Sequence, residues 1–166
     1  MSAQDHIRVL LVDDEENLVE YMSKRLLKNG FSVKASFSGE EAIEAAKDAT
    51  YDVAVVDLKM PGMDGVETQK RLREIQPFLQ CIVLTGHGSI ESALESGHED
   101  AFEYLLKPVD YDILMSKIKE AYDKKQSVQG AKFREEVEKI QASGLGPRGI
   151  RKAIKSLEQL YGIDTE

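Results

Sequence analysis

The sequence predicts an α/β fold in which helices cover both faces of a five-stranded, doubly wound parallel sheet. The first observation is that five short apolar runs alternate with five segments of helical periodicity, which implies parallel strands joined by right-handed crossovers. The second is that three of the runs are almost entirely apolar, as strands are when both of their faces are buried.

The predicted strands are short and lie between positions 7 and 106. Their residues are Ile7–Val12, Phe31–Ala35, Val53–Val56, Cys81–Leu84 and Tyr104–Leu106. Apolar residues at helical spacing mark the first and the last helix of this body. In chain order they are Leu18, Met22 and Leu26, and then Leu114, Ile118 and Tyr122. Gly30 follows the first of these helices as a stop signal.

Two further helices begin at capping boxes. Ser38 is followed three residues later by Glu41, and Asp64 is followed by Glu67 in the same way. A side-chain oxygen at the first position accepts a hydrogen bond from the backbone N–H at the second, which defines the start of a helix. The pattern therefore predicts helices after the second and the third strand.

Length and composition limit the class of protein. The chain has 166 residues, of which 42% are hydrophobic, so we expect one domain with a small addition and a substantial core. A single cysteine excludes an internal disulfide and favours a cytoplasmic protein, and no apolar run is long enough for a membrane span. The segment Met1–Arg8 is polar and does not resemble a secretion signal.

Charge is distributed unevenly along the chain, whose net charge is −8. Residues 1–123 contain 13 basic and 24 acidic residues, whereas residues 124–166 contain 9 basic and 6 acidic residues. We therefore expect an acidic globular body followed by a mildly basic tail. The acidic total argues against a chain that binds nucleic acid as a whole.

Polar side chains stand at the carboxyl ends of four predicted strands. Asp13 and Asp14 follow the first strand and Asp57 the third. Thr85 follows the fourth strand and Lys107 the fifth. Since the carboxyl ends of parallel strands meet at one edge of a sheet, these residues are expected to lie together. Three crowded carboxylates repel one another, and carboxylate oxygens with water are the usual ligands of Mg²⁺, so a magnesium site is predicted.

This set of groups suits phosphoryl transfer. A divalent ion, a lysine and a hydroxyl can hold the oxygens of a phosphoryl group, and a carboxylate can accept that group as an aspartyl phosphate. The sequence has no Gly-rich phosphate loop of the Walker A type, so a nucleotide bound to this chain is not the expected donor.

Residues 6–123 resemble the receiver domain of bacterial response regulators, and most closely receivers of the nitrogen-regulation type. Four segments carry the resemblance: Val9–Glu15, Asp57–Gly65, Thr85–Gly88 and Tyr104–Pro108. The resemblance implies a flavodoxin-like sheet with strand order 2-1-3-4-5. It also implies a signalling switch rather than a metabolic enzyme, with Mg²⁺-dependent self-phosphorylation and autodephosphorylation.

The resemblance implies a role for each residue at these strand ends. Asp57 would accept a phosphoryl group from a sensor histidine kinase or a phosphotransfer protein. Asp14, Asp57 and the backbone carbonyl of Lys59 would bind Mg²⁺ directly, and Asp13 would assist through water. Lys107 would pair with a phosphoryl oxygen.

Two residues would report phosphorylation. The hydroxyl of Thr85 would hydrogen-bond a phosphoryl oxygen, and the ring of Tyr104 would follow it inward. The alternative for Thr85 is a simple cap at the end of its strand, and the alternative for Tyr104 is a ring fixed in the core. The Lys107–Pro108 peptide would be cis, a form that only X–Pro bonds adopt at low cost. A flavin-binding relative is disfavoured, because acidic residues at positions 13–16 occupy the place of its phosphate loop.

The residue pattern of the tail predicts two short amphipathic helices. Residues 124–130 are expected to be a linker and residues 131–166 a helical extension. Apolar residues recur at helical spacing on both sides of a break at Ser143–Pro147: Phe133, Val137 and Ile140, then Ile150, Ile154, Leu157 and Tyr161. Two such helices cannot bury their stripes alone, so we expect them to pack on each other, on the receiver, on a second copy or on another protein.

Four basic residues repeat at helical spacing on the second tail helix: Arg148, Arg151, Lys152 and Lys155. A solvated face, docking on an acidic protein surface and contact with DNA are the three interpretations. We favour a receiver that controls a downstream protein target and that can also form a homodimer. The alternative is a transcription regulator whose basic tail binds DNA.

Overall fold

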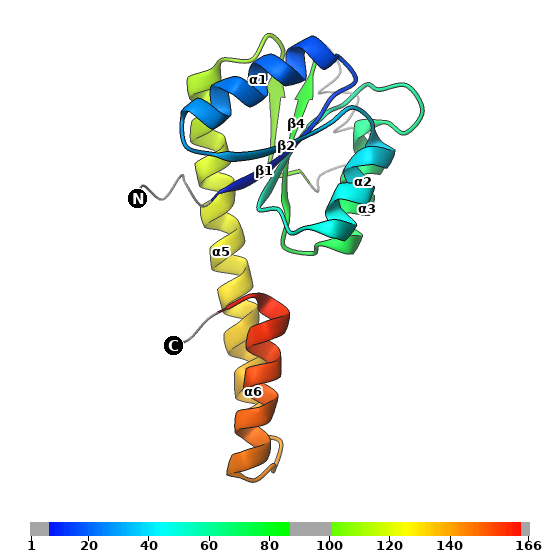
Figure 1. The fold of residues 1–166 in the computed structure, drawn as a ribbon. Helices are drawn as coiled ribbons and strands as arrows, with labels where there is room; N and C mark the ends of the chain where they lie inside the picture. The colour runs from blue at the N-terminus through cyan, green and yellow to red at the C-terminus, as the bar shows by residue number, and fades with distance from the viewer. Residues whose placement is uncertain (1–6, 87–100, 164–166) are drawn as a thin grey trace. The chain divides into compact units, whose positions relative to one another are not determined.

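The computed structural model describes residues 7–86 and 101–163 and confirms the predicted sheet. Five parallel strands are paired in the order β2-β1-β3-β4-β5 (Figure 1). Their bounds, in the order β1 to β5, are Arg8–Val12, Ser32–Ser36, Val53–Asp57, Gln80–Thr85 and Glu103–Leu106. These bounds differ from the predicted ones by no more than one residue at either end.

Helices α1 (Glu16–Lys28), α2 (Gly39–Asp48) and α3 (Gly65–Ile75) follow the first three strands in turn. Helix α5 (Tyr111–Gln141) follows β5, and α6 (Pro147–Tyr161) follows a short break. The helix expected between the fourth and fifth strands lies outside the described residues. No helix in the described part of the chain combines the length and the apolarity that crossing a membrane requires.

The predicted caps form as expected. The Oγ atom of Ser38 accepts a hydrogen bond of 3.1 Å from the backbone N–H of Glu41, and Oδ1 of Asp64 accepts one of 2.9 Å from the N–H of Glu67. Helix α1 ends before Gly30, whose φ of +92° lies in the left-handed region that glycine adopts without strain.

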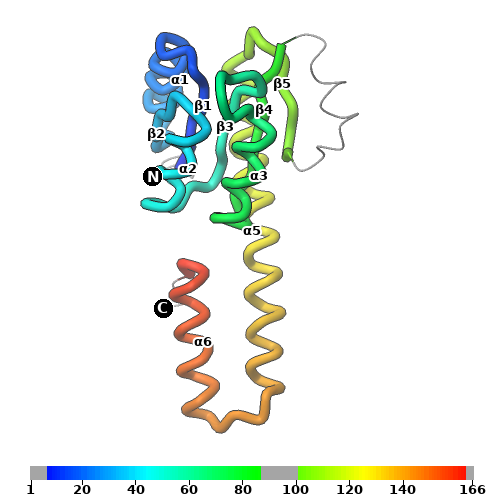
Figure 2. The backbone as a smooth tube through the Cα atoms, turned by 90° about the vertical axis from the view of Figure 1, so that its right-hand side faces the viewer, coloured from blue at the N-terminus to red at the C-terminus, as the bar shows by residue number. Residues whose placement is uncertain are grey.

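Alternate residues of the strands face two separate apolar layers. On β1, Val9 and Leu11 face the layer that α1 and α5 cover, whereas Leu10 and Val12 face α2 and α3 (Figures 1 and 2). The helix side chains buried in the first layer are Val19, Met22, Leu26, Leu114, Ile118 and Ala121. Because strand side chains alternate between faces, near-continuous apolar strands need a helical cover on both sides.

The chain divides into two compact units, residues 1–125 and 126–166. Helix α5 continues without interruption through residues 124–130, so the expectation of a linker there is wrong for the backbone. The lysines and glutamines in this stretch are good helix formers, which offsets the cost of about 1 kcal/mol for a helical glycine at Gly130. The first tail helix is accordingly the end of a long helix rather than a short separate one.

Residues 126–163 form a helical hairpin from the end of α5 and from α6 (Figure 2). The side chain of Gln129 donates a 2.6 Å hydrogen bond to the carbonyl of Tyr161, and the rings of Phe133 and Tyr161 meet edge to face at 5.6 Å. Leu157 is buried, while the other residues of the two predicted stripes are only half-buried. The hairpin confirms that the tail helices pack on each other.

A buried ion pair lies at the amino end of the sheet, where the sequence analysis expected no special feature. The Nζ atom of Lys125 is 2.7 Å from Oδ1 of Asp52 and donates to the carbonyl of Tyr51 at 3.3 Å. The two side chains are 7% and 3% exposed. Arg8 donates to the same carboxylate from its backbone N–H at 2.9 Å. Burial opposes ionisation of Asp52, but the hydrogen bonds from Lys125 and Arg8 outweigh it and lower its pKa.

Candidate functional site

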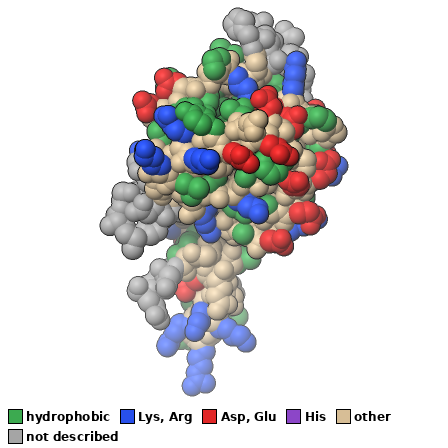
Figure 3. Space-filling model, turned by 45° about the horizontal axis from the view of Figure 1, so that its top comes forward, with side chains coloured by type: hydrophobic (Ala, Val, Ile, Leu, Met, Phe, Trp, Pro, Cys, Tyr) green, Lys and Arg blue, Asp and Glu red, His purple; other side chains and the backbone are tan. Residues whose placement is uncertain are grey.

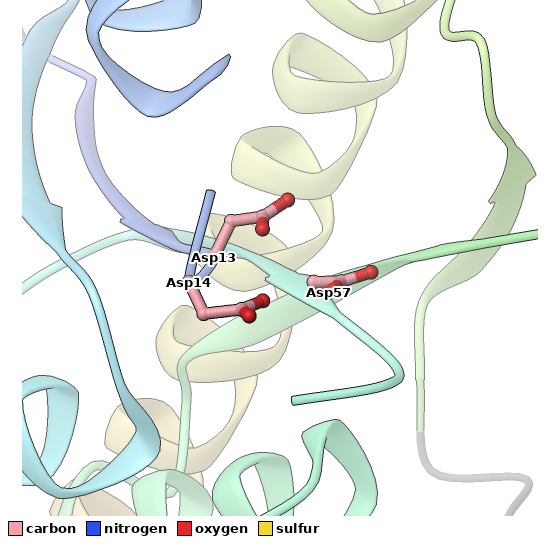
Figure 4. A group of neighbouring side chains, drawn as sticks. All are labelled: Asp13, Asp14 and Asp57. Atoms are coloured by element: carbon pink, nitrogen blue, oxygen red, sulfur yellow. The ribbon is translucent and has the colours of Figure 1, made fainter. Parts of the chain in front are cut away.

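Three carboxylates meet at the carboxyl edge of the sheet. Asp13 and Asp14 follow β1, and Asp57 ends the neighbouring strand β3, because Val12 pairs with Val56. One oxygen from each carboxylate lies within 4.8 Å of the others, and Figure 4 shows the three side chains close together and projecting to the same side. Asp13 and Asp57 are buried, whereas Asp14 is exposed. The predicted acidic cluster is therefore present.

Lys107 lies between two of these carboxylates. Its Nζ atom is 2.9 Å from Oδ2 of Asp13 and 3.0 Å from Oδ1 of Asp57. The backbone N–H of Lys107 donates to the carbonyl of Thr85 at 2.8 Å, which ties the ends of β4 and β5 together. The peptide that joins Lys107 to Pro108 is cis, as the resemblance implied.

The carboxylates outweigh the lysine in the charge balance of the pocket. Burial raises the pKa of Asp57, and the negative charges of Asp13 and Asp14 add to this, although Lys107 opposes them. For Lys107, burial favours the neutral amine, but hydrogen bonds with Asp13 and Asp57 dominate and raise its pKa. In the part of the chain that the structure describes, the pocket thus holds three acids and one cation, an excess of negative charge that a further cation would relieve.

The donor set fits Mg²⁺. Among the described residues, the acidic cluster offers carboxylate oxygens as ligands, and the exposed position of Asp14 leaves room for water ligands. Asp14 and Asp57 would hold the ion, with Asp13 beside them. A bound Mg²⁺ neutralises charge that builds up on the oxygens of a phosphoryl group. Lys59 lies two residues beyond the end of β3 and its side chain is exposed, so the role of its carbonyl stays a prediction.

The two predicted reporter residues lie on adjacent strands. Thr85 ends β4 and is 1% exposed, and its hydroxyl donates to the carbonyl of Gly86 at 3.3 Å. The residue before it pairs with Asp57 across the sheet, so Thr85 borders the pocket. Tyr104 is half-buried on β5, where it pairs with Val83 and packs in the small cluster that includes Leu58.

Sequence reasoning missed Gly65, which stands directly behind the pocket. A Cβ atom at this position would lie 2.3 Å from the carbonyl oxygen of Asp57 and 2.8 Å from Cα of Leu58. The backbone N–H of Gly65 donates to the carbonyl of Leu58 at 2.9 Å. A glycine at the first position of a helix, where no turn requires it, is the sequence signal for such a close approach.

The Gly65→Ala variant is therefore expected to destabilise the fold by about 2–3 kcal/mol, because the added methyl group meets backbone atoms that cannot move aside. Chemical denaturation measures this change. Gly130→Ala is the matched control, since its nearest atom is the end of the Arg134 side chain at 3.5 Å and a helical alanine is favoured. Equal stability of wild type and Gly65→Ala would contradict the close approach.

Mg²⁺ is expected to stabilise the folded chain, by about 2.7 kcal/mol at a hundredfold excess over its dissociation constant. Asp14→Asn removes one ligand and should weaken this binding on the order of tenfold or more. The measurement is the thermal unfolding midpoint as a function of Mg²⁺ concentration. Glu16→Gln, which changes an exposed carboxylate two residues away, should behave as wild type. Equal Mg²⁺ dependence in the Asp14→Asn variant would remove Asp14 from the ligand set.

Comparison with protein families agrees with this geometry. The family model described as the response regulator receiver domain matches residues 9–119. The chain belongs to the response regulator receiver family. As a receiver it is a phosphorylation-dependent switch rather than a classical enzyme, and its acidic pocket is typical of a phosphoacceptor site.

Curated relatives of the nitrogen-regulation type are similar to this receiver. It is 33% identical over 129 residues to the transcriptional regulatory protein GlrR of Escherichia coli, covering 78% of this chain and 29% of GlrR. It is 32% identical to the DNA-binding transcriptional regulator NtrC of Klebsiella pneumoniae, covering 72% of this chain and 25% of NtrC. The chain thus spans less than a third of either relative's length.

Solved receivers share the fold. The response regulator protein TrrA of Thermotoga maritima, solved in complex with Mg²⁺ and BeF, matches with a TM-score of 0.62 and 32% identity. The match covers 69% of this chain and 98% of the TrrA chain.

The four basic residues predicted on the second tail helix lie on α6, in the compact unit of residues 126–166. All four are exposed: Arg148, Arg151, Lys152 and Lys155.

Proposed function

We propose that this receiver, within residues 6–123, accepts a phosphoryl group on Asp57 and controls a protein partner through the resulting change of conformation. The observation that carries the proposal is the position of the Asp57 carboxylate, which Lys107 contacts at 3.0 Å and which Asp13 and Asp14 approach within 4.8 Å. This arrangement supplies a nucleophile, a cation for a phosphoryl oxygen and ligands for Mg²⁺.

The donor is a phosphohistidine on a sensor histidine kinase or a phosphotransfer protein. A carboxylate oxygen of Asp57 attacks the phosphorus atom, the P–N bond breaks as the P–O bond forms, and the imidazole leaves with its electron pair. Lys107 holds one anionic oxygen in this step. Attack by water on the aspartyl phosphate later returns inorganic phosphate and the free carboxylate, which resets the switch.

The switch acts through Thr85 and Tyr104. The Thr85 hydroxyl, which donates to the carbonyl of Gly86 in the unphosphorylated chain, turns to a phosphoryl oxygen. The ring of Tyr104 then moves toward the space that Thr85 leaves, and the surface around β4 and β5 changes for a partner. Because Tyr104 is half-buried, this ring can move without opening the main apolar layers.

Phosphoryl uptake from a small-molecule donor, followed by intact-protein mass spectrometry with and without Mg²⁺, tests the proposed function. Addition of one phosphoryl group that requires Mg²⁺ is expected. No uptake from either a small donor or a phosphorylated histidine kinase, by a chain shown to bind Mg²⁺, would overturn it.

Thr85→Ala is expected to separate phosphorylation from switching. This variant should take up phosphoryl groups within about tenfold of the wild-type rate, since one neutral hydrogen bond is lost. With beryllofluoride and Mg²⁺, which stand in for the phosphoryl group, wild type should change its amide exchange along β4 and β5. The variant should show little of this change. An identical exchange response in both proteins would exclude Thr85 as the reporter, and Thr85→Ser is the control that keeps the hydroxyl.

A further inference from the structure

One face of α6 carries four exposed cations: Arg148, Arg151, Lys152 and Lys155. The first turn of α6 contains no acidic residue, so these cations crowd the amino half of the helix, where the helix dipole disfavours positive charge. In the described part of the hairpin the ion pairs join Glu135 to Lys132 and Lys139 instead. Neither the stability of α6 nor pairing within the hairpin therefore accounts for this basic face.

The opposite charge gathers at the carboxyl edge of the receiver. Six exposed acidic residues lie in the loops and first helical turns after β1, β2 and β3, and we call them the acidic rim: Asp14, Glu15, Glu16, Glu40, Glu41 and Asp64. Figure 3 shows acidic side chains over the centre and right of this face and several basic side chains on its left. Of the two lysines that the structure describes at this edge, Lys107 is held by Asp13 and Asp57, and Lys59 is exposed.

We propose that the basic face of α6 binds the acidic rim of a second copy of this chain. The two surfaces match in charge, since residues 124–166 have a net charge of +3 and residues 1–123 a net charge of −11. Contact between two copies of the tail is disfavoured, because like charges would meet. Two such contacts related by a two-fold axis close a pair. This pairing goes beyond the proposed function and needs no phosphorylation.

The four cations gather at one end of the hairpin. Gln129 contacts Tyr161, so the chain runs antiparallel and the first turns of α6 lie at the other end of the hairpin. The sixteen helical residues from Gln126 to Gln141 span about 24 Å at 1.5 Å per residue. All four cations are exposed at this end of the hairpin, where a second copy of the chain can contact them.

Sedimentation velocity of the full chain over a range of concentrations tests the pairing. Wild type should form a dimer at about 0.05 M salt that weakens on the order of tenfold or more at about 0.5 M salt, because the contact is between exposed charges. Arg151→Glu/Lys152→Glu should weaken the dimer by a similar factor. Lys24→Glu/Lys70→Glu, which makes the same change of net charge at exposed sites on α1 and α3, should leave it unchanged.

Charge exchange between copies then identifies the partner surface. Glu16→Lys/Glu40→Lys reverses part of the acidic rim and should also prevent pairing by itself. Mixing this variant with Arg151→Glu/Lys152→Glu should restore a dimer, since each tail then meets a rim of opposite charge. Circular dichroism of each variant alone, matched to wild type, shows that both remain folded.

Three results would overturn the pairing. The first is a wild type that stays monomeric at low salt, and the second is a mixture that does not restore the dimer although each variant is folded. The third is a chain that never pairs but binds duplex DNA, with an affinity that Arg151→Glu/Lys152→Glu abolishes. This result would assign the basic face to nucleic acid.

Discussion

Asp57→Asn should abolish phosphoryl incorporation, lowering its rate by a factor of about 10³ or more, because an amide cannot act as the nucleophile at this position. The Asp57 carboxylate is buried in the acidic pocket and contacts Lys107 at 3.0 Å. Intact mass after incubation with a small-molecule phosphodonor and Mg²⁺ measures the effect. Wild type should gain a single phosphoryl group that hydroxylamine removes, as an acyl phosphate requires.

Loss of incorporation in this variant should not reflect unfolding. Since the pKa of Asp57 is raised in the folded chain, its ionised form opposes folding at neutral pH. Asp57→Asn should therefore be at least as stable as wild type at pH 7, and this advantage should shrink as the pH falls through the raised pKa and be lost once the pH is below the ordinary aspartate value of about 4. Asp123→Asn, at an exposed position on α5, is the control for incorporation. Wild-type incorporation in Asp57→Asn would place the phosphoacceptor elsewhere.

Lys125→Met is expected to lower the free energy of unfolding of the receiver by about 2–4 kcal/mol, because it leaves the buried Asp52 carboxylate with Arg8 alone. The lysine is held by Asp52 and by the carbonyl of Tyr51, so its loss removes two contacts at once. Urea denaturation measures the change. Lys124→Met, at the exposed neighbouring position, should change stability by less than about 0.5 kcal/mol.

A second substitution separates the ion pair from simple packing. Adding Asp52→Asn to Lys125→Met should recover part of the loss, since no uncompensated charge is then buried. The pKa of Asp52 is lowered in the folded chain, so the stability that it contributes is complete above the ordinary aspartate pKa and is lost as the pH falls through the lowered value. The difference between wild type and Lys125→Met should therefore be largest at neutral pH. A difference that is constant down to pH 2 would contradict the role of this charge.

Much of the pocket could be predicted because the parallel sheet itself positions its members. Asp13, Asp57, Thr85 and Lys107 each stand at a strand end, and parallel strands bring their carboxyl ends to one edge whatever the loops do. The strand bounds were equally accessible, since buried strands are apolar on both faces. Residues 124–130 are helical rather than a linker, because the residues around Gly130 favour a continuous helix.

The sheet, the order of its helices and the acidic edge were all predictable, because they follow from periodicity and from the residue at the end of each strand. The groups that meet across long sequence separations became evident only in the folded chain. Lys125 shares a helix face with Leu114, Ile118 and Ala121, but its partner Asp52 lies 73 residues away. The need for glycine at position 65 likewise becomes clear only from the backbone of Asp57, which leaves no space for a Cβ atom. Periodicity assigns a side chain to a face, and the packing of that face against another element determines what it touches.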